Sequence, residues 1–196
     1  MPNGKVTITV QFQPINADMS WQNPFMDISE SDWYFDAVKF VNRNRLMNGV
    51  GNGSFAPNTH LSRAMFAQIL YNKAERPSTT NNNIFSDVPN GVWFTDAIVW
   101  ATANNIVNGY NGQFKPNDPI TREQLVLMLW RYEGQPTSQS TLLGYVDASD
   151  ISDYALDAMC WAVKNGVIKG KGNGILDPKG FATRAETAQI LMNHLN

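Results

Sequence analysis

The chain has 196 residues, and its 15 Lys and Arg against 17 Asp and Glu give a formal net charge of −2. This charge gives no field that would favour nucleic acid or an anionic membrane surface, and no apolar run approaches the roughly 18 residues that span a bilayer. A hydrophobic content of 43% argues against disorder, and the single cysteine, Cys160, excludes an intrachain disulfide framework. We therefore expect a globular protein that binds no nucleic acid and inserts into no membrane.

Residues 1–20 differ in pattern from the rest of the chain. From Lys5 to Phe12, apolar and polar side chains alternate with period two, which is typical of a β-strand. A lone strand is unstable without partners. We expect this segment to be a remnant of an upstream domain or a strand that pairs with another chain.

The remainder, residues 21–196, contains one pattern three times with a period of about 60 residues, which indicates one structural unit used three times. The copies occupy residues 21–78, 79–138 and 139–196. Each has an aromatic residue and an aspartate near its start, a second aromatic, an Asn-Gly or Lys-Gly pair, a proline and a Ser/Thr-Arg pair. The aromatic and aspartate pairs are Phe25 and Asp27, Phe85 and Asp87, and Tyr145 and Asp147.

Each copy predicts two helices joined by a Gly/Asn-rich loop. The first helix is predicted to begin near Trp33, Trp93 or Tyr154, and its apolar residues recur with helical spacing. The second is predicted to follow the Ser/Thr-Arg pair. A two-helix unit cannot bury its apolar face alone, so we expect the three copies to share one core and fold as one cooperative unit.

These motifs closely resemble the S-layer homology domain family, over roughly residues 24–196. The best match is the second copy, with Phe85-Ser-Asp-Val88, Asn108-Gly109, Phe114-Lys-Pro116 and Ile120-Thr-Arg-Glu-Gln124. The resemblance implies a mainly α fold in which three two-helix repeats form one monomeric, pseudo-threefold body. It further implies that the first helices make a central three-helix bundle, while the second helices project and leave grooves between them.

The resemblance also implies a function outside the cell, at the bacterial cell wall, with an export signal upstream in a longer precursor. In this family the module is non-catalytic and tethers a larger surface protein by binding an acidic, often pyruvylated, secondary cell wall polysaccharide. The sequence itself also indicates a non-catalytic module. His60 and His194 lie outside the repeated motifs, and no catalytic, cofactor or metal-ligand spacing occurs. A protein–protein or self-assembly module of a surface layer is the alternative.

The Ser/Thr-Arg segments predict helix N-caps. Thr121 with Gln124, and Thr183 with Glu186, match the capping box, in which the two side chains satisfy each other's backbone N–H groups. Ser62 keeps the cap, but Met65 stands where the reciprocal acceptor would be. Capping explains the hydroxyl residues but not the arginine that follows each of them.

That arginine, Arg63, Arg122 or Arg184, faces the positive end of its helix dipole, which costs about 0.3–1 kcal/mol. Chance or an ion pair with a nearby aspartate is one explanation. We favour an anion site in which free backbone N–H groups and the guanidinium converge on a carboxylate or phosphate. The resemblance implies that this arginine lines the groove and holds the acidic sugar.

Trp33, which follows Asp32, and Trp93 are either core aromatics or platforms for a pyranose ring. The third copy has the smaller Tyr154 there, and its Lys179 replaces an asparagine of the other copies, so we expect unequal grooves. Asp27, Asp87 and Asp147 are interpreted as turn residues. The candidate polysaccharide-binding residues are thus Asp32, Trp33, Arg63, Trp93, Arg122, Gln124, Tyr154, Lys179, Arg184 and Glu186.

Overall fold

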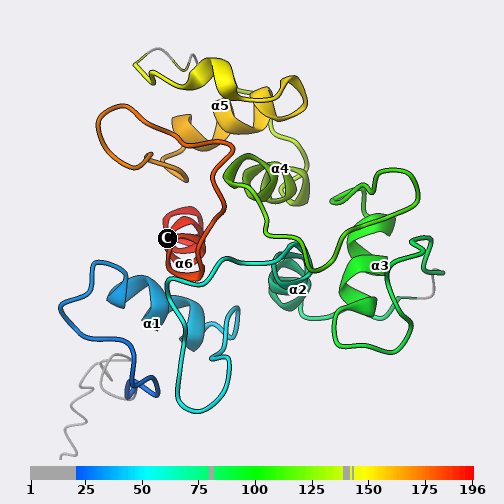
Figure 1. Cartoon of the computed structure of the whole chain (residues 1–196), viewed down its shortest axis with the longest axis horizontal. Coiled ribbons are helices and arrows are strands. Elements are labelled where there is room, and N and C mark those ends of the chain that lie inside the picture. Colours follow the sequence, from blue (N-terminus) through cyan, green and yellow to red (C-terminus); the bar gives the residue numbers. More distant parts are fainter. Residues whose placement is uncertain (1–20, 80–81, 139–141, 143) are drawn as a thin grey trace, which may run out of the picture.

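The computed structural model describes residues 21–79, 82–138, 142 and 144–196 (Figure 1). The strand predicted from Lys5 to Phe12 lies outside the described residues. The described part is mainly helical, and its only β-pairings are isolated bridges. Its elements in chain order are α1 (Phe35–Arg43), α2 (Arg63–Lys73), α3 (Thr95–Ala103), α4 (Arg122–Tyr132), η1 (Ala148–Asp150), η2 (Asp153–Ala155), α5 (Leu156–Lys164) and α6 (Arg184–Leu195).

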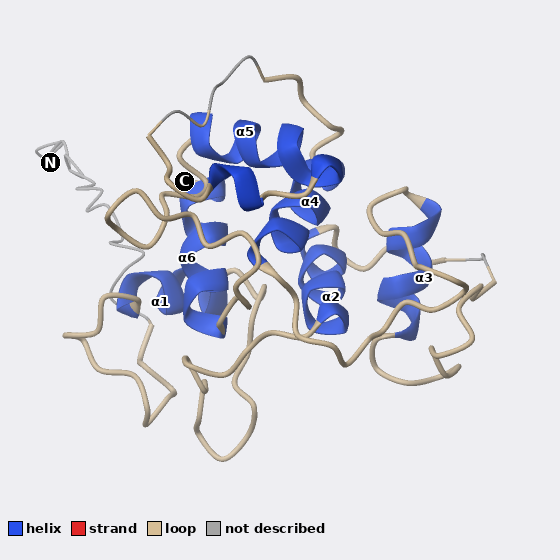
Figure 2. Ribbon diagram, turned by 45° about the horizontal axis from the view of Figure 1, so that its top comes forward, coloured by secondary structure: helices blue, strands red, loops and turns tan. Residues whose placement is uncertain are grey.

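Each repeat contributes two α-helices, and a long loop separates the first helix from the second (Figure 2). The second helices α2, α4 and α6 begin directly after Ser62, Thr121 and Thr183. The first helices α1 and α3 begin two residues later than Trp33 and Trp93, because both tryptophans lie in the turn before the helix.

The second helices, not the first, occupy the centre. In Figure 1, α2, α4 and α6 stand together in the middle, and α1, α3 and α5 surround them. The prediction that the first helices form the central bundle was therefore wrong. Burial does not separate the two kinds of helix, since α2, α3 and α6 each bury six residues. The segments that lead into the second helices instead hydrogen-bond to one another, which brings those helices together. The amphipathic pattern marked both kinds of helix as packed without ranking them.

Helix pairs form between repeats rather than within them. α3 packs on α2, α5 packs on α4, and α1 packs on α6, so each first helix rests on the second helix of the preceding repeat. The α1–α6 pair joins the first repeat to the last and closes the body into a ring. Every repeat thus depends on both others for the burial of its apolar faces.

A ring of backbone hydrogen bonds marks the centre of this arrangement. The N–H of Leu61 donates to the carbonyl of Ala182 at 2.9 Å, Ile120 donates to Leu61 at 2.9 Å, and Ala182 donates to Ile120 at 3.0 Å. All three side chains are fully buried. Because these residues immediately precede the second helices, the ring fixes where those helices begin around the pseudo-threefold axis.

The motif aspartates hold the loops that lead to the second helices. The Asp27 carboxylate accepts hydrogen bonds from the N–H groups of Phe55 and Ala56, both at 2.8 Å, and Asp87 and Asp147 make the matching pairs. Burial alone would raise the pKa of Asp27, but bonds from Ser54 and these two N–H groups outweigh it and lower the pKa. The aspartates are therefore turn residues.

Candidate functional site

The recurrent arginines clamp neighbouring repeats together. The Nε–H of each donates to a backbone carbonyl of the next repeat around the ring: Arg63 to Phe114 at 2.9 Å, Arg122 to Leu176 at 2.8 Å, and Arg184 to Phe55 at 2.7 Å. The guanidinium groups of Arg63 and Arg184 also lie 4.7 Å and 4.6 Å over the rings of Phe114 and Phe55. This role accounts for an arginine in all three copies.

The backbone N–H groups at the start of the second helices are already bonded. In α2, the N–H groups of Arg63 and Ala64 donate to the carbonyls of Asp118 and Pro116, both at 3.0 Å. The first two N–H groups of α4 and α6 likewise donate to the following repeat around the ring. The prediction of an anion site built from free N–H groups was wrong, so any anion would have to be bound by side chains.

The hydroxyl of each capping residue accepts a hydrogen bond from the N–H of the third residue of its helix. Ser62 accepts from the N–H of Met65 at 3.2 Å. No reciprocal hydrogen bond forms, because the Met65 side chain has no carboxylate or amide oxygen to accept one. Thr121 with Gln124, and Thr183 with Glu186, form reciprocal capping boxes. In these boxes Gln124 Oε1 and Glu186 Oε2 accept from the N–H groups of Thr121 and Thr183.

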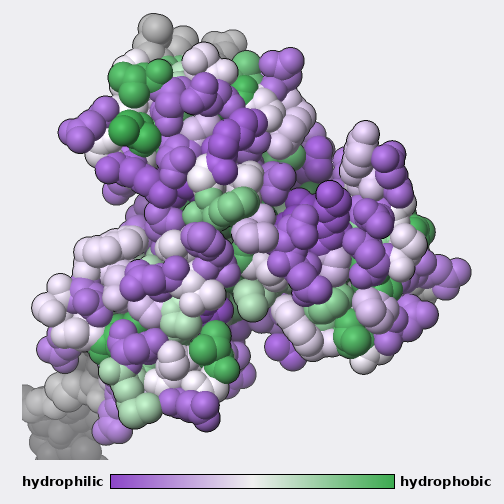
Figure 3. Space-filling view, viewed as in Figure 1, coloured by the Kyte–Doolittle hydropathy of each residue, from purple (hydrophilic) through white to green (hydrophobic). Residues whose placement is uncertain are grey.

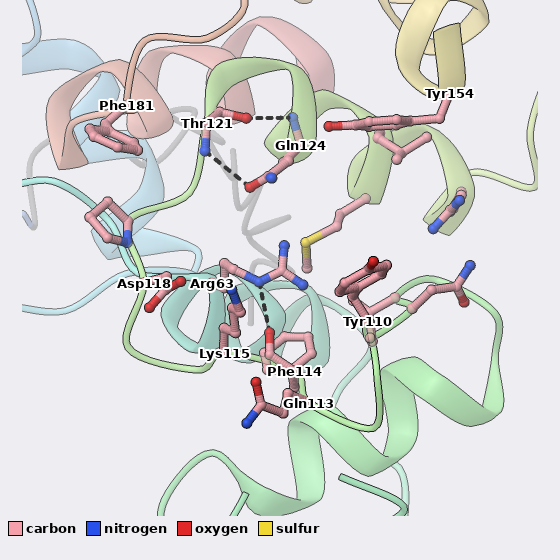
Figure 4. Close-up of a pocket in the computed structure, with 17 residues that line it drawn as sticks. Arg63, Tyr110, Gln113, Phe114, Lys115, Asp118, Thr121, Gln124, Tyr154 and Phe181 are labelled. Atoms are coloured by element: carbon pink, nitrogen blue, oxygen red, sulfur yellow. Dashed lines mark hydrogen bonds between the residues drawn. The ribbon is translucent and has the colours of Figure 1, made fainter. Parts of the chain in front are cut away.

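A cavity lies where all three repeats meet, and we call it groove 2. It encloses about 570 Å³. Its walls include Arg63 from the first repeat, Tyr110 and Gln124 from the second, and Tyr154 from the third. In Figure 4 the Arg63 guanidinium, Tyr110 and Tyr154 lie around the same space. Groove 2 therefore combines a cationic fork with aromatic walls.

A related cavity of about 400 Å³, groove 1, lies one repeat earlier. Its walls include Asn48, Met65, Trp93 and Arg184. In that order, these are the repeat counterparts of four residues that line groove 2, namely Asn108, Gln124, Tyr154 and Arg63. A groove is thus built from the loop and second helix of one repeat, the arginine of the preceding repeat and the aromatic residue of the following one.

The repeat counterparts of these positions in the third repeat are Glu186, Arg122 and Trp33, and we call this place groove 3. Here the ionic contacts differ, because Arg122 Nη1 lies 3.9 Å from Glu186 Oε1 and Lys171 Nζ lies 3.3 Å from the same oxygen. Lys171 also forms an ion pair with Asp177 at 2.7 Å. Burial alone would raise the pKa of Glu186, but the Thr183 N–H, Arg122 and Lys171 outweigh it and lower the pKa.

Grooves 1 and 2 carry a surplus of positive charge. Arg63, Lys115 and Arg131 line groove 2 against one carboxylate, Asp118. Groove 1 is lined by Arg76 and Arg184 and by no acidic residue among those that the structure describes. Burial lowers the pKa of Arg63 and Arg184, since desolvation disfavours a charge. A bound anion would offset part of that desolvation cost.

The motif aromatics are exposed, which excludes the interpretation that they are core residues. The exposed fractions are 64% for Trp33, 60% for Trp93 and 55% for Tyr154. Trp93 lines groove 1, and Tyr154 lines groove 2. Asp32 is half-buried, and its carboxylate accepts from the N–H of Ser29 at 2.7 Å. The face of the molecule seen in Figure 3 is mostly polar, with separate apolar patches.

Sequence reasoning missed Glu123, a carboxylate that is only 2% exposed. It accepts hydrogen bonds from the Tyr154 hydroxyl at 2.8 Å, from the N–H and hydroxyl of Ser152 at 2.9 Å each, and from Lys179 at 2.7 Å. Burial alone would raise the pKa of Glu123, but these bonds outweigh it and lower the pKa. Lys179, a candidate ligand-binding residue, forms an ion pair with Glu123 at 2.7 Å, and the hydrogen bond to Glu123 raises the pKa of that lysine.

A signal for Glu123 was present in the chain. The other copies have Ala64 and Ala185 at its position, and its partners Tyr154 and Lys179 are also peculiar to the third copy. An acid without repeat counterparts, facing a lysine without repeat counterparts, indicates a contact between two particular copies. In the described part of the chain, no cluster of side chains suits a metal ion, and no helix has the length and apolarity to cross a membrane.

Comparison with known proteins places these features in a family. A model of the S-layer homology domain matches residues 24–67, 84–126 and 144–188. The chain is 30% identical over 193 residues to an amylopullulanase of Thermoanaerobacterium thermosulfurigenes, covering 96% of this chain and 10% of that protein. It is 32% identical over 171 residues to exoglucanase XynX of Acetivibrio thermocellus, covering 85% of this chain and 16% of the relative.

A surface-layer protein matches as well. The surface-layer 125 kDa protein of Lysinibacillus sphaericus is 32% identical over 162 residues, which cover 79% of this chain and 13% of that protein. The chain thus spans between 10% and 16% of the length of these three relatives. The similarity is therefore to a module that larger proteins share.

Proposed function

The chain belongs to the S-layer homology domain family, and we propose that it anchors a larger protein at the bacterial cell surface by binding an acidic wall polysaccharide. The S-layer homology domain is a non-catalytic anchoring module. Its relatives here combine it with unlike functions, a surface-layer protein in one case and glycan-degrading enzymes in others, which suits a shared tether. Cell-surface location follows from the same relatives.

Groove 2 is the observation that supports polysaccharide binding most strongly. Its volume of about 570 Å³ lies in the range of about 300–1,000 Å³ that is common for small-molecule sites. An exposed aromatic ring can cover the apolar face of a pyranose, and Tyr110 and Tyr154 offer two such rings. Because these groups come from different repeats, the groove exists only in the assembled body.

The charge of the groove indicates an acidic sugar. The Nε–H of Arg63 donates to the Phe114 carbonyl, and the rest of the guanidinium points towards the cavity, as Figure 4 shows. A carboxylate is the group that pairs best with a guanidinium fork. Met128 and Leu127 add apolar surface beside it. A pyruvate ketal, which has a carboxylate and a methyl group on one carbon, matches both features.

The experiment is a sedimentation assay with purified cell wall sacculi from a bacterium whose wall carries a pyruvylated polymer. The chain should bind intact sacculi and lose most of that binding after the non-peptidoglycan polymer is extracted. Binding that survives extraction would contradict the proposal. Self-association without sacculi, followed by light scattering, would instead support an assembly module.

A further inference from the structure

We propose that Glu186 closes groove 3 by taking, at Arg122, the place that an acidic ligand would take in the other grooves. This inference rests on the proposed function, because it concerns which grooves admit an acidic sugar. It makes the chain a two-site binder with a third, latent site.

Glu186 reaches the arginine because of its place in the capping box. Its Oε2 accepts from the N–H of Thr183 at 2.9 Å, which fixes the carboxyl group at the start of α6. Its Oε1 then faces Arg122 at 3.9 Å and Lys171 at 3.3 Å. Arg122 is buried, at 3% exposed, so Glu186 gives it a counterion within the protein. An internal carboxylate thus occupies the cationic end of groove 3.

The equivalent positions in the other grooves carry no charge. Met65 stands there in groove 1 and Gln124 in groove 2, and both line their cavities. In the ranges that the structure describes, no carboxylate forms an ion pair with Arg63 or Arg184. These two arginines therefore have no carboxylate counterion among the described residues, whereas Arg122 has one.

The remaining charges of groove 3 show what opening it would do. Lys171 is shared by Glu186 and Asp177, so two cations and two carboxylates balance one another. Lys169 is exposed in the place of Asn48 and Asn108, which line the other two grooves. Removing the charge of Glu186 would leave a surplus of positive charge in groove 3 as well.

The test is a calorimetric titration of the full chain with the methyl glycoside of a pyruvate-ketal hexose, and with the neutral parent glycoside as a control. We expect the wild type to bind two acidic ligands, one each in grooves 1 and 2, and Glu186→Gln to bind three. Glutamine keeps the cap, since Gln124 forms the same capping box in α4. Glu186→Met, which copies Met65, should also bind three ligands. This second variant keeps the test valid if Glu186→Gln folds poorly.

The reciprocal change is Gln124→Glu, which should close groove 2 and reduce binding to one ligand per chain. A wild type that binds three ligands would overturn the inference and leave the proposed function standing. So would an unchanged count of two in folded Glu186→Gln and Glu186→Met. A wild type that binds neither this glycoside nor extracted polymer would defeat the proposed function, and the inference with it.

Discussion

Arg184 and Phe55 lie 129 residues apart in the sequence, yet the Arg184 Nε–H donates to the Phe55 carbonyl at 2.7 Å. The guanidinium also stacks 4.6 Å over the Phe55 ring and donates to the carbonyl of Asn48 at 2.6 Å. This contact joins the last helix to the first repeat at the point where α1 packs on α6. The chain is therefore held as a closed ring whose grooves depend on closure.

Arg184→Ala should destabilise the fold, because it removes two charge-assisted hydrogen bonds and leaves the carbonyls of Phe55 and Asn48 without their donor. We expect a loss of about 1.5–3 kcal/mol in the free energy of unfolding, measured by urea denaturation. The matched control is Lys164→Ala at an exposed position, which should change stability by less than about 0.5 kcal/mol. Equal stability of the two variants would contradict the clamp.

Thr183→Ala should cost about 1 kcal/mol, because it removes the hydroxyl that accepts from Glu186 N–H at 3.2 Å. Ser62→Ala should cost the same or less, since Met65 completes no capping box. Thermal denaturation of both variants measures the difference. If neither shifts the midpoint, the caps contribute nothing to the start of the second helices.

Deleting residues 142–196 should abolish cooperative folding. The deletion removes α6, on which α1 packs, and α5, which packs on α4, so apolar faces of both remaining repeats become exposed. We expect aggregation or a broad, non-cooperative melt, recorded by circular dichroism. A sharp melt with two-thirds of the polymer binding retained would show that the repeats are independent.

Stability should fall in acid partly through Glu123. Its folded-state pKa lies below its ordinary value of 4.5, so the ionised group stabilises the fold fully above that pH. This contribution is lost as the pH falls from there through the folded-state pKa. Urea denaturation across this range should show a shallower decline for Glu123→Gln than for the wild type. Parallel curves would show that Glu123 makes no net ionic contribution.

The sequence predicted the repeats, the order of their elements and the capping residues, because these depend on motifs a few residues long. It did not predict which helices are central. Amphipathic spacing shows that a helix packs, but the partner of α1 is α6, at the far end of the chain. Local patterns carry no information about such a pairing.

The role of the arginines was missed for the same reason. Their partners are carbonyls of Phe114, Leu176 and Phe55, at sequence separations of 51, 54 and 129 residues. A helix-dipole argument treats the helix start as open, whereas the next repeat covers it. The aromatic residues were left undecided, because an exposed tryptophan and a core tryptophan have the same local sequence pattern.

The most direct measurement of acidic ligand binding in groove 2 uses Arg131→Ala. Arg131 lines groove 2, is half-buried, and has asparagine at its equivalent positions, Asn72 and Asn193. Calorimetry with the pyruvate-ketal glycoside should show one site weakened by about 1.5–3 kcal/mol, or at least about tenfold, with the thermal midpoint and the other site unchanged. Lys164→Ala should bind as the wild type does. Unaltered affinity of both sites in Arg131→Ala, or equal affinity for the neutral glycoside, would contradict an acidic-sugar site in groove 2.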